Sequence, residues 1–128
     1  MFNRTGVTKV TGAAPVQILF DVEHQMSVPV MVSGSSENFV TENSRKIVKA
    51  GTPLAGDLLA RGTAFTTTNG NTAVAVLLHD VDITDGAANA TALIWGFVNL
   101  SRLASAPAAL VTSAVKTALA GKVYFLQD

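Results

Sequence analysis

The apolar residues of this chain are divided into short runs by turn-forming residues, and this pattern constrains the fold more than any other feature. Such runs occupy residues 16–23, 27–33, 74–78, 92–100 and 122–127. They are rich in β-branched, aliphatic or aromatic side chains, which fit the pleated surface of a sheet. Gly, Pro, Asn and Ser separate the runs and mark the turns. The sequence therefore predicts a mostly-β domain.

Turn residues also predict how the first strands are arranged. The runs 16–23 and 27–33 lie close enough along the chain to form a hairpin. Pro29 has no N–H to donate, so the second run fits best at a sheet edge or a bulge. Asn43-Ser44-Arg45 is expected to be a turn between two short extended pieces.

The middle of the chain predicts a second hairpin. Asn69-Gly70-Asn71 supplies the positive φ that a tight hairpin turn requires. The run 74–78 that follows is continuously apolar, and we expect it to be buried on both faces. Residues 85–91 are expected to form the next turn. The strand after it contains Gly96, which predicts a bulge or a point of close approach.

Only residues 105–122 show the period of a helix. Ser105 can cap it, Pro107 suits its first turn, and Gly121 is placed to end it. Apolar side chains form one stripe on a 3.6-residue period. The stripe consists of Leu110, Val111, Ala114, Val115, Ala118 and Leu119. We therefore expect one short C-terminal helix.

The domain organisation follows from these elements. A chain of 128 residues is one domain on size alone and is long enough to bury a core. We expect residues 15–128 to form a single β-rich domain. Residues 1–14 are rich in Thr, Gly and Ala without a sustained period, and we expect them to form an extended N-terminal arm.

The charge content excludes several kinds of partner. Charged residues make up 14% of the chain, against about 25% in an average soluble domain. Lys+Arg and Asp+Glu both number 9, so nothing supplies the attraction to phosphate that dominates nucleic-acid binding. We expect no membrane span and no secretory signal, because no long apolar stretch is present. A neutral, charge-poor monomer is poorly soluble, so we expect other chains to cover much of the surface.

The stretch His79-Asp80-Val81-Asp82 is the strongest candidate for chemistry. Adjacent His and Asp side chains on a strand point to opposite faces, so both do not easily bind one ion. Asp80 and Asp82 share a face, but two carboxylates alone make a weak calcium site. The other histidine, His24, is far along the chain. We favour a structural role for the motif, in which Asp80 or His79 satisfies backbone groups at a bulge.

The remaining candidates are weaker. The chain has no cysteine, which excludes thiolate nucleophiles and Cys-ligated zinc. Ser101 and Ser105 have no nearby histidine to activate them. The cationic residues 45–49 are expected to be a solvated edge. Trp95 and Phe97 share a strand face, and a core pair is favoured over a sugar platform. We predict no catalytic residue, no cofactor and no metal site.

Two segments resemble a known family. "ENSRKIVKAGTPLAGD" and "AVAVLLHDVDITDGAANATALIWGFVNLSRL", residues 42–57 and 73–103, resemble the head decoration and head-fibre proteins of tailed bacteriophages. That group shares a "KIVKAGTP" strand and turn, a variable loop with glycine, a strand of the form V-x-V-L-L-x-D-V-D-x-T, and a "GFVNL" strand. These motifs carry no catalytic meaning, and the His-Asp-x-Asp stretch lies inside them as part of the fold.

The resemblance implies a small β-barrel-like, tulip-like domain that is commonly a trimer. Such a protein is made in the host cytoplasm and sits on the outer surface of the mature icosahedral virion. There it cements neighbouring major capsid subunits, as in lambda-type members. The implied partners are the major capsid protein and further copies of the chain, and the N-terminal residues 2–14 are expected to add a strand to the capsid. Trp95 and Phe97 are expected either in the core or at the threefold contact.

Two other functions stay open. One is a virion-displayed module that binds a host surface or glycan, which requires an exposed aromatic platform. The other is a small metal-dependent hydrolase built on His79, Asp80 and Asp82.

Overall fold

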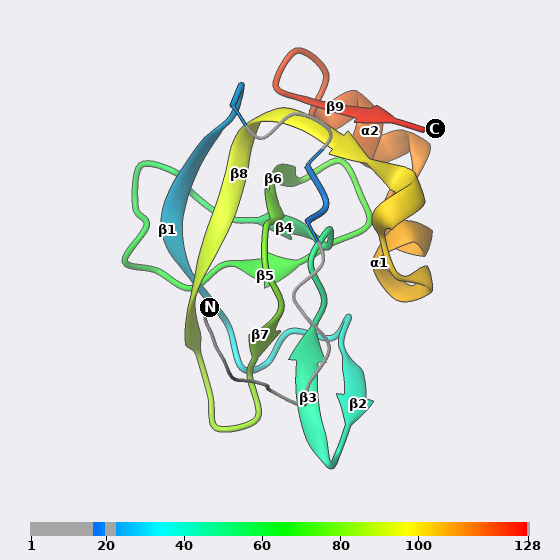
Figure 1. Ribbon diagram of the computed structural model, residues 1–128. Coiled ribbons are helices and arrows are strands. Elements are labelled where there is room, and N and C mark those ends of the chain that lie inside the picture. The colour runs from blue at the N-terminus through cyan, green and yellow to red at the C-terminus, as the bar shows by residue number, and fades with distance from the viewer. Residues whose placement is uncertain (1–16, 20–22, 128) are drawn as a thin grey trace, which may run out of the picture.

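The computed structural model describes residues 17–19 and 23–127, and the mostly-β class is confirmed (Figure 1). The strands are β1 (Met26–Val32), β2 (Val40–Glu42), β3 (Arg45–Val48), β4 (Pro53–Ala55), β5 (Thr66–Thr67), β6 (Ala73–Leu77), β7 (Val81–Asp82), β8 (Ala88–Asn99) and β9 (Val123–Leu126). The helices are the short 3-10 helix η2 (Leu100–Arg102), α1 (Ser105–Leu110) and α2 (Ser113–Ala118). The predicted arm, residues 1–14, lies outside the described residues, and the tulip-like arrangement stays a prediction.

The strands form two sheets, and β8 is the strand with the most partners in the larger one. The larger sheet has the order β1-β8-β6-β4-β5, and β9 pairs with β8 in parallel. The smaller sheet has the order β2-β3-β7. With 12 residues, β8 is long enough to pair with β1 and β6 along its first part and with β9 at Gly96–Asn99. Figure 1 shows β2 and β3 projecting at the end of the molecule away from β9.

Pro29 lies in the edge strand β1, as its missing N–H predicted. The Met31 carbonyl accepts from the Phe65 N–H at 2.7 Å, and the Ser33 N–H donates to the Phe65 carbonyl at 2.7 Å. The odd-numbered residues of β1 therefore direct their backbone groups away from β8. Pro29 leaves no unpaired N–H there, and its carbonyl accepts from the Arg61 guanidinium at 3.1 Å. This edge is thus protected against pairing with another chain.

The hairpin predicted around residues 69–71 is wrong. The hairpin predicted from runs 16–23 and 27–33 falls in part on residues 16 and 20–22, which lie outside the described residues; within them, Leu19 bridges to Val98 of β8. Strand β4 lies between β5 and β6, so the turn at Asn69-Gly70-Asn71 does not close a two-stranded hairpin. The positive-φ pair of a two-residue hairpin is instead Asn43 and Ser44, with φ of 51° and 64°, between β2 and β3. The turn predicted at residues 43–45 is confirmed.

Strand β8 begins earlier than predicted, and its pairing with β1 is irregular next to Gly96. It starts at Ala88, so the predicted turn 85–91 is shorter than its range. The register between β1 and β8 shifts at Met26/Ser27, opposite Trp95 and Leu93. Gly96 follows this irregularity with φ of +154°, and a Cβ there would lie 3.2 Å from the Gln25 Cβ. The predicted close approach at Gly96 is confirmed, and the bulge lies just before it, between Leu93 and Trp95.

The predicted single helix is wrong, because Val111 and Thr112 divide it into α1 and α2. The Thr112 hydroxyl accepts from the Val115 N–H at 3.3 Å and donates to the Asn69 carbonyl at 2.7 Å. Threonine side chains offer the backbone such local alternatives to a continuous helix. Pro107 lies in the first turn of α1, as predicted, and Gly121 has φ of +79° beyond the end of α2.

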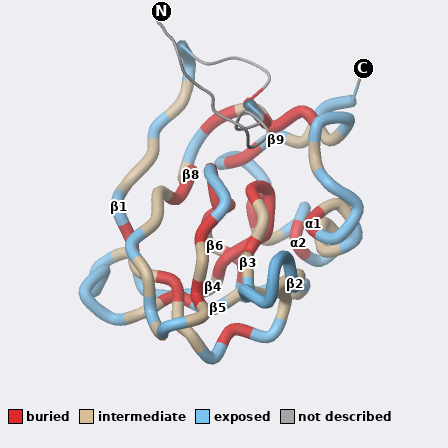
Figure 2. The backbone as a smooth tube through the Cα atoms, turned by 60° about the horizontal axis from the view of Figure 1, so that its bottom comes forward, coloured by how far each residue is buried: buried red, intermediate tan, exposed pale blue. Residues whose placement is uncertain are grey.

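The core consists of two clusters joined by β6 (Figure 2). Val76 of β6 packs into the cluster beneath α2 and β9, with Val115 and Leu119. Ala75 and Leu77 belong to the cluster around Phe65. Successive residues of β6 thus enter different clusters, which confirms the prediction that this run is buried on both faces. Val74 is the one residue of β6 that is only half-buried.

Candidate functional surface

In the His79-Asp80-Val81-Asp82 stretch, Asp80 contacts the chain that follows β3. One Asp80 carboxylate oxygen accepts from the Ala50 N–H at 2.7 Å, and the other lies 3.4 Å from the Lys49 ammonium. Lys49 also pairs with Glu42 at 2.8 Å. Asp80 therefore satisfies a backbone group at the end of β3, which is the structural role expected for the motif. The His79 side chain is exposed.

Asp82 is held by a second set of contacts on the same side of the small sheet. Its carboxylate accepts from the Arg45 Nε and, at 2.9 Å, from the Thr84 N–H. Arg45 reaches Asp85 as well, at 3.0 Å. The Arg45 hydrogen bond, followed by those from Thr84, lowers the pKa of Asp82 from 3.8 to about 2. The hydrogen bonds from Asp82 and Asp85 raise the pKa of Arg45 in turn.

These contacts account for the cationic residues 45–49. Arg45 and Lys49 are in ion pairs, and the Lys46 ammonium lies 5.3 Å from the centre of the Phe39 ring. Strand β3 is the central strand of the small sheet, so the expectation of an edge is wrong. In the part of the chain that is described, no group of three or more His, Cys, Asp or Glu side chains is placed to hold a metal ion.

Trp95 and Phe97 lie on the outer face of β8, so the expectation of a core pair is wrong. Trp95 keeps 42% of its surface exposed. Its ring meets Phe97 edge-on at 6.1 Å between centroids, and Phe97 stacks on Tyr124 at 5.4 Å. Parallel pairing places Tyr124 of β9 beside Phe97, and antiparallel pairing places Met26 of β1 beside Trp95. The three rings thus span β8 and β9, and Met26 extends the apolar surface onto β1.

We call this surface the apolar strip and define it by Met26, Trp95, Phe97, Tyr124 and Leu126. Sequence reasoning missed three of its members, although "VYFLQ" alternates in a way that puts Tyr124 and Leu126 on one strand face. Nothing in the alternation says which face is outside, because Val123 and Phe125 are apolar too. Val123 is the residue that is buried.

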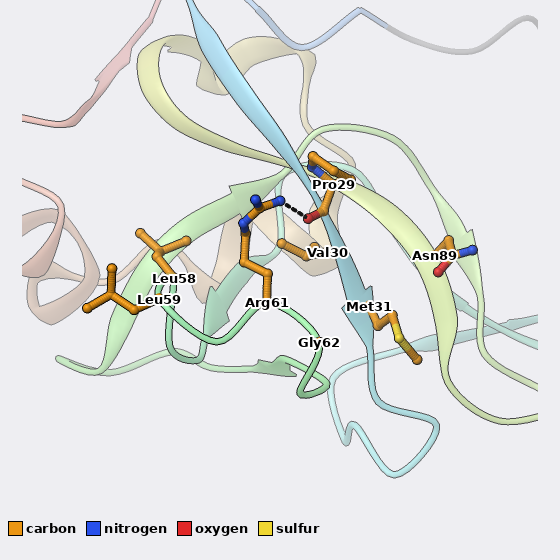
Figure 3. Close-up of a pocket in the computed structure, with 8 residues that line it drawn as sticks. All are labelled: Pro29, Val30, Met31, Leu58, Leu59, Arg61, Gly62 and Asn89. Carbon is orange, nitrogen blue, oxygen red and sulfur yellow. Dashed lines mark hydrogen bonds between the residues drawn. The ribbon is translucent and has the colours of Figure 1, made fainter.

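A shallow groove of about 650 Å³ lies beside β1 (Figure 3). The loop that carries Leu58, Leu59 and Arg61 forms one wall, and Pro29, Val30 and Met31 form the other. The only charged side chain in this lining is Arg61, which is engaged with the Pro29 carbonyl. The groove brings no acid or base next to a nucleophile.

Two further findings concern the chain as a whole. Among the helices of the described residues, none is long and apolar enough to cross a membrane. Comparison with known protein families and with curated proteins returns no match to this chain.

Proposed function

We propose that this chain is a virion structural protein that binds the outside of a mature phage capsid and cements neighbouring major capsid subunits. The starting point is the resemblance of residues 42–57 and 73–103 to phage head decoration proteins. In the fold these residues supply β3, β4, β6, β7 and β8. Within each sheet these strands pair directly with one another, β3 with β7 in the smaller sheet and β4, β6 and β8 in sequence in the larger. The resemblance thus concerns the connected centre of the domain and not scattered loops.

The observation that carries this proposal is how the polar and apolar side chains are used. The carboxylates of Asp80 and Asp82 already accept hydrogen bonds that hold the fold together. Large apolar side chains, in contrast, stand on the surface in the apolar strip. A domain arranged in this way is suited to contacts with other chains, because burial of apolar surface drives association.

The mechanism that we propose is physical. A protein that binds only the expanded lattice stabilises that lattice by mass action. A homotrimer joins several contacts, and linked contacts reinforce one another even when each is weak. We propose that residues 2–14, which lie outside the described residues, add a strand to the major capsid protein.

The direct test is to add the purified protein to undecorated, expanded heads and to image them by cryo-electron microscopy. We expect ordered density on the outer surface at lattice symmetry axes. Heads that remain bare at a saturating protein concentration would contradict the proposal. Unexpanded heads are the matched control and are expected to bind little.

A deletion tests the role of the N-terminal residues. A variant that lacks residues 2–14 is expected to keep its circular dichroism spectrum and thermal transition, yet to lose binding to heads in a co-sedimentation assay. Binding equal to that of the full chain would remove the arm from the mechanism while leaving the cementing role to other surfaces.

The exposure of Trp95 favours a second candidate, a virion-displayed module that binds a host surface or glycan. Sugar rings stack on exposed aromatic side chains, and Trp95 and Tyr124 are both more than two-fifths exposed. A glycan array probed with the wild-type chain and with Trp95→Ala tests this candidate. Binding that the substitution abolishes would support it, and an array without signal would remove it.

A further inference from the structure

The exposed large apolar side chains are gathered in one place. Among the described residues five such side chains are exposed, and four of them, Met26, Trp95, Tyr124 and Leu126, belong to the apolar strip. The fifth, Leu59, is 98% exposed and lies on the loop beside the groove of Figure 3. Scattered apolar residues are normal on protein surfaces, whereas a contiguous patch marks an interaction site.

The strip borders a sheet edge that is open among the described strands. Strand β9 pairs with β8 alone. The Gly96 N–H donates to the Lys122 carbonyl, and the Val123 N–H donates to the Leu119 carbonyl. Backbone groups alternate along a parallel pair, so Val123 and Phe125 direct theirs away from β8. The N–H and C=O of Phe125 therefore face the open edge.

Strands β1 and β9 both lie at an edge of the larger sheet, but they differ in how their open side is protected. Strand β1 is protected by Pro29 and by the Arg61 hydrogen bond to its carbonyl. Strand β9 contains no proline and no charged residue. Proteins usually blunt exposed edges with such residues, because an open edge recruits another strand. An unprotected edge beside an exposed apolar strip is the arrangement of a surface that is covered in the working assembly.

The charge pattern identifies a second copy of this chain as the covering partner. Residues near the symmetry axis of an assembly meet their equivalents in the other copies, so a charge there would face its like. The five side chains of the strip carry no charge, and Lys122 lies only at its end, where the rim of an interface is polar. Aromatic residues and methionine are also the types enriched at the centres of interfaces.

We propose that the apolar strip and the open edge of β9 form the contact between copies of this chain. A glycan fits less well, because the five members offer only two polar side-chain groups, the Tyr124 hydroxyl and the Trp95 indole N–H. This inference deepens the proposed function and rests on it, since both hold that the chain works through contacts with other chains.

The test compares oligomeric state across three proteins by sedimentation velocity over a range of concentrations. The wild-type chain is expected to form a discrete assembly of two or three copies. Tyr124→Lys places a charge at the centre of the strip and is expected to weaken assembly by at least about 30-fold, as expected for a hot-spot aromatic. Leu59→Lys is the matched control, because Leu59 is equally apolar and even more exposed, and it is expected to assemble normally.

A second measurement guards against a variant that fails to fold. Backbone hydrogen exchange of the wild-type chain is expected to slow at Phe125 as concentration rises, because its N–H becomes paired in the assembly. The amide of Leu59 is expected to exchange at the same rate throughout. Concentration-dependent protection at β9 supports the inference without any substitution.

The outcomes separate this inference from the proposed function. A wild-type chain that stays monomeric at its highest soluble concentration overturns the inference, as does Tyr124→Lys assembly equal to wild type. If that monomer still decorates expanded heads, the proposed function stands and only the copy contact fails. A strip-dependent oligomer that ignores heads contradicts the proposed function and keeps the contact. A monomer that binds a glycan through Trp95 assigns the strip to the other candidate.

Discussion

At the residue scale, the His79-Asp80-Val81-Asp82 motif, which most resembles a catalytic or metal site, has a structural role. Asp80 and Asp82 both accept backbone N–H groups, from Ala50 and Thr84, and both face cations from β3 or its end. The sequence alone established that neighbouring side chains on a strand diverge, which weakened the metal hypothesis. It did not identify Arg45 as the partner of Asp82, because 37 residues separate them.

The neighbours Asp80 and His79 are expected to differ sharply in their contribution to stability. Asp80→Ala leaves the N–H of Ala50, which is 9% exposed, without its acceptor, and we expect a loss of about 1–2 kcal/mol in the free energy of unfolding. His79→Ala removes an exposed side chain and is expected to change it by less than about 0.5 kcal/mol. Urea unfolding at pH 7 measures both. Equal losses would mean that the motif is not organised around Asp80.

Asp82 is expected to make stability depend on pH in acid. Its pKa in the folded chain, about 2, lies below the ordinary value of 3.8, so the ionised carboxylate favours the folded state. That contribution is complete above the ordinary value and is lost as the pH falls from about 4 to about 2. The difference in unfolding free energy between wild type and Asp82→Asn should therefore shrink over this range.

Urea titrations at several pH values provide the measurement for Asp82. Asp85→Asn is the matched control, because Asp85 is the other partner of Arg45. The Asp85 side chain is 87% exposed. We expect a smaller effect from it at every pH. A wild-type advantage that stays constant down to pH 2 would contradict the role given to the Arg45–Asp82 pair.

At the scale of elements, β8 determines how the two clusters of the core meet. Its partners change along its length from β1 and β6 to β9, and the change falls at the bulge before Gly96. Glycine was recognisable in the sequence as a breaker inside a strand. The parallel pairing with β9 was not, because it depends on where α1 and α2 return the chain.

Gly96→Ala is expected to lower the free energy of unfolding by about 1–3 kcal/mol. The added Cβ would lie 3.2 Å from both the Gln25 Cβ and the Leu93 Cδ1, at a φ of +154° that suits glycine. Gly62→Ala is the control, since nothing lies within 4 Å of its Cβ position, and it should be nearly neutral. Thermal unfolding followed by circular dichroism compares them. A neutral Gly96→Ala would mean that β8 adjusts at the bulge without strain.

At the scale of the whole molecule, low charge and an exposed apolar strip point to a chain that works in contact with others. Equal numbers of basic and acidic residues, 9 of each, leave no long-range repulsion between copies. Six of the 18 charged residues are also engaged in ion pairs in or beside the small sheet. Attraction between copies must then come from apolar burial.

Self-association through the strip is accordingly expected to depend little on salt. Between about 50 and about 500 mM NaCl the dissociation constant should change by less than about 3-fold, because screening acts on charges and not on apolar contact. Sedimentation equilibrium at the two concentrations measures it. A change of about ten-fold or more would indicate that charged residues outside the strip dominate the contact.

The sequence by itself determined that the domain is mostly β, that β6 is buried on both faces, that Pro29 lies at an edge and that Gly96 marks a bulge. Each of these follows from local chemistry: side-chain period, a missing N–H or a missing Cβ. Only the tertiary structure decided that β4 lies between β5 and β6, that Thr112 divides the helix, and that Trp95 and Phe97 face outward. Where both faces of a strand are apolar, period two leaves inside and outside equivalent, and long-range pairing makes the choice.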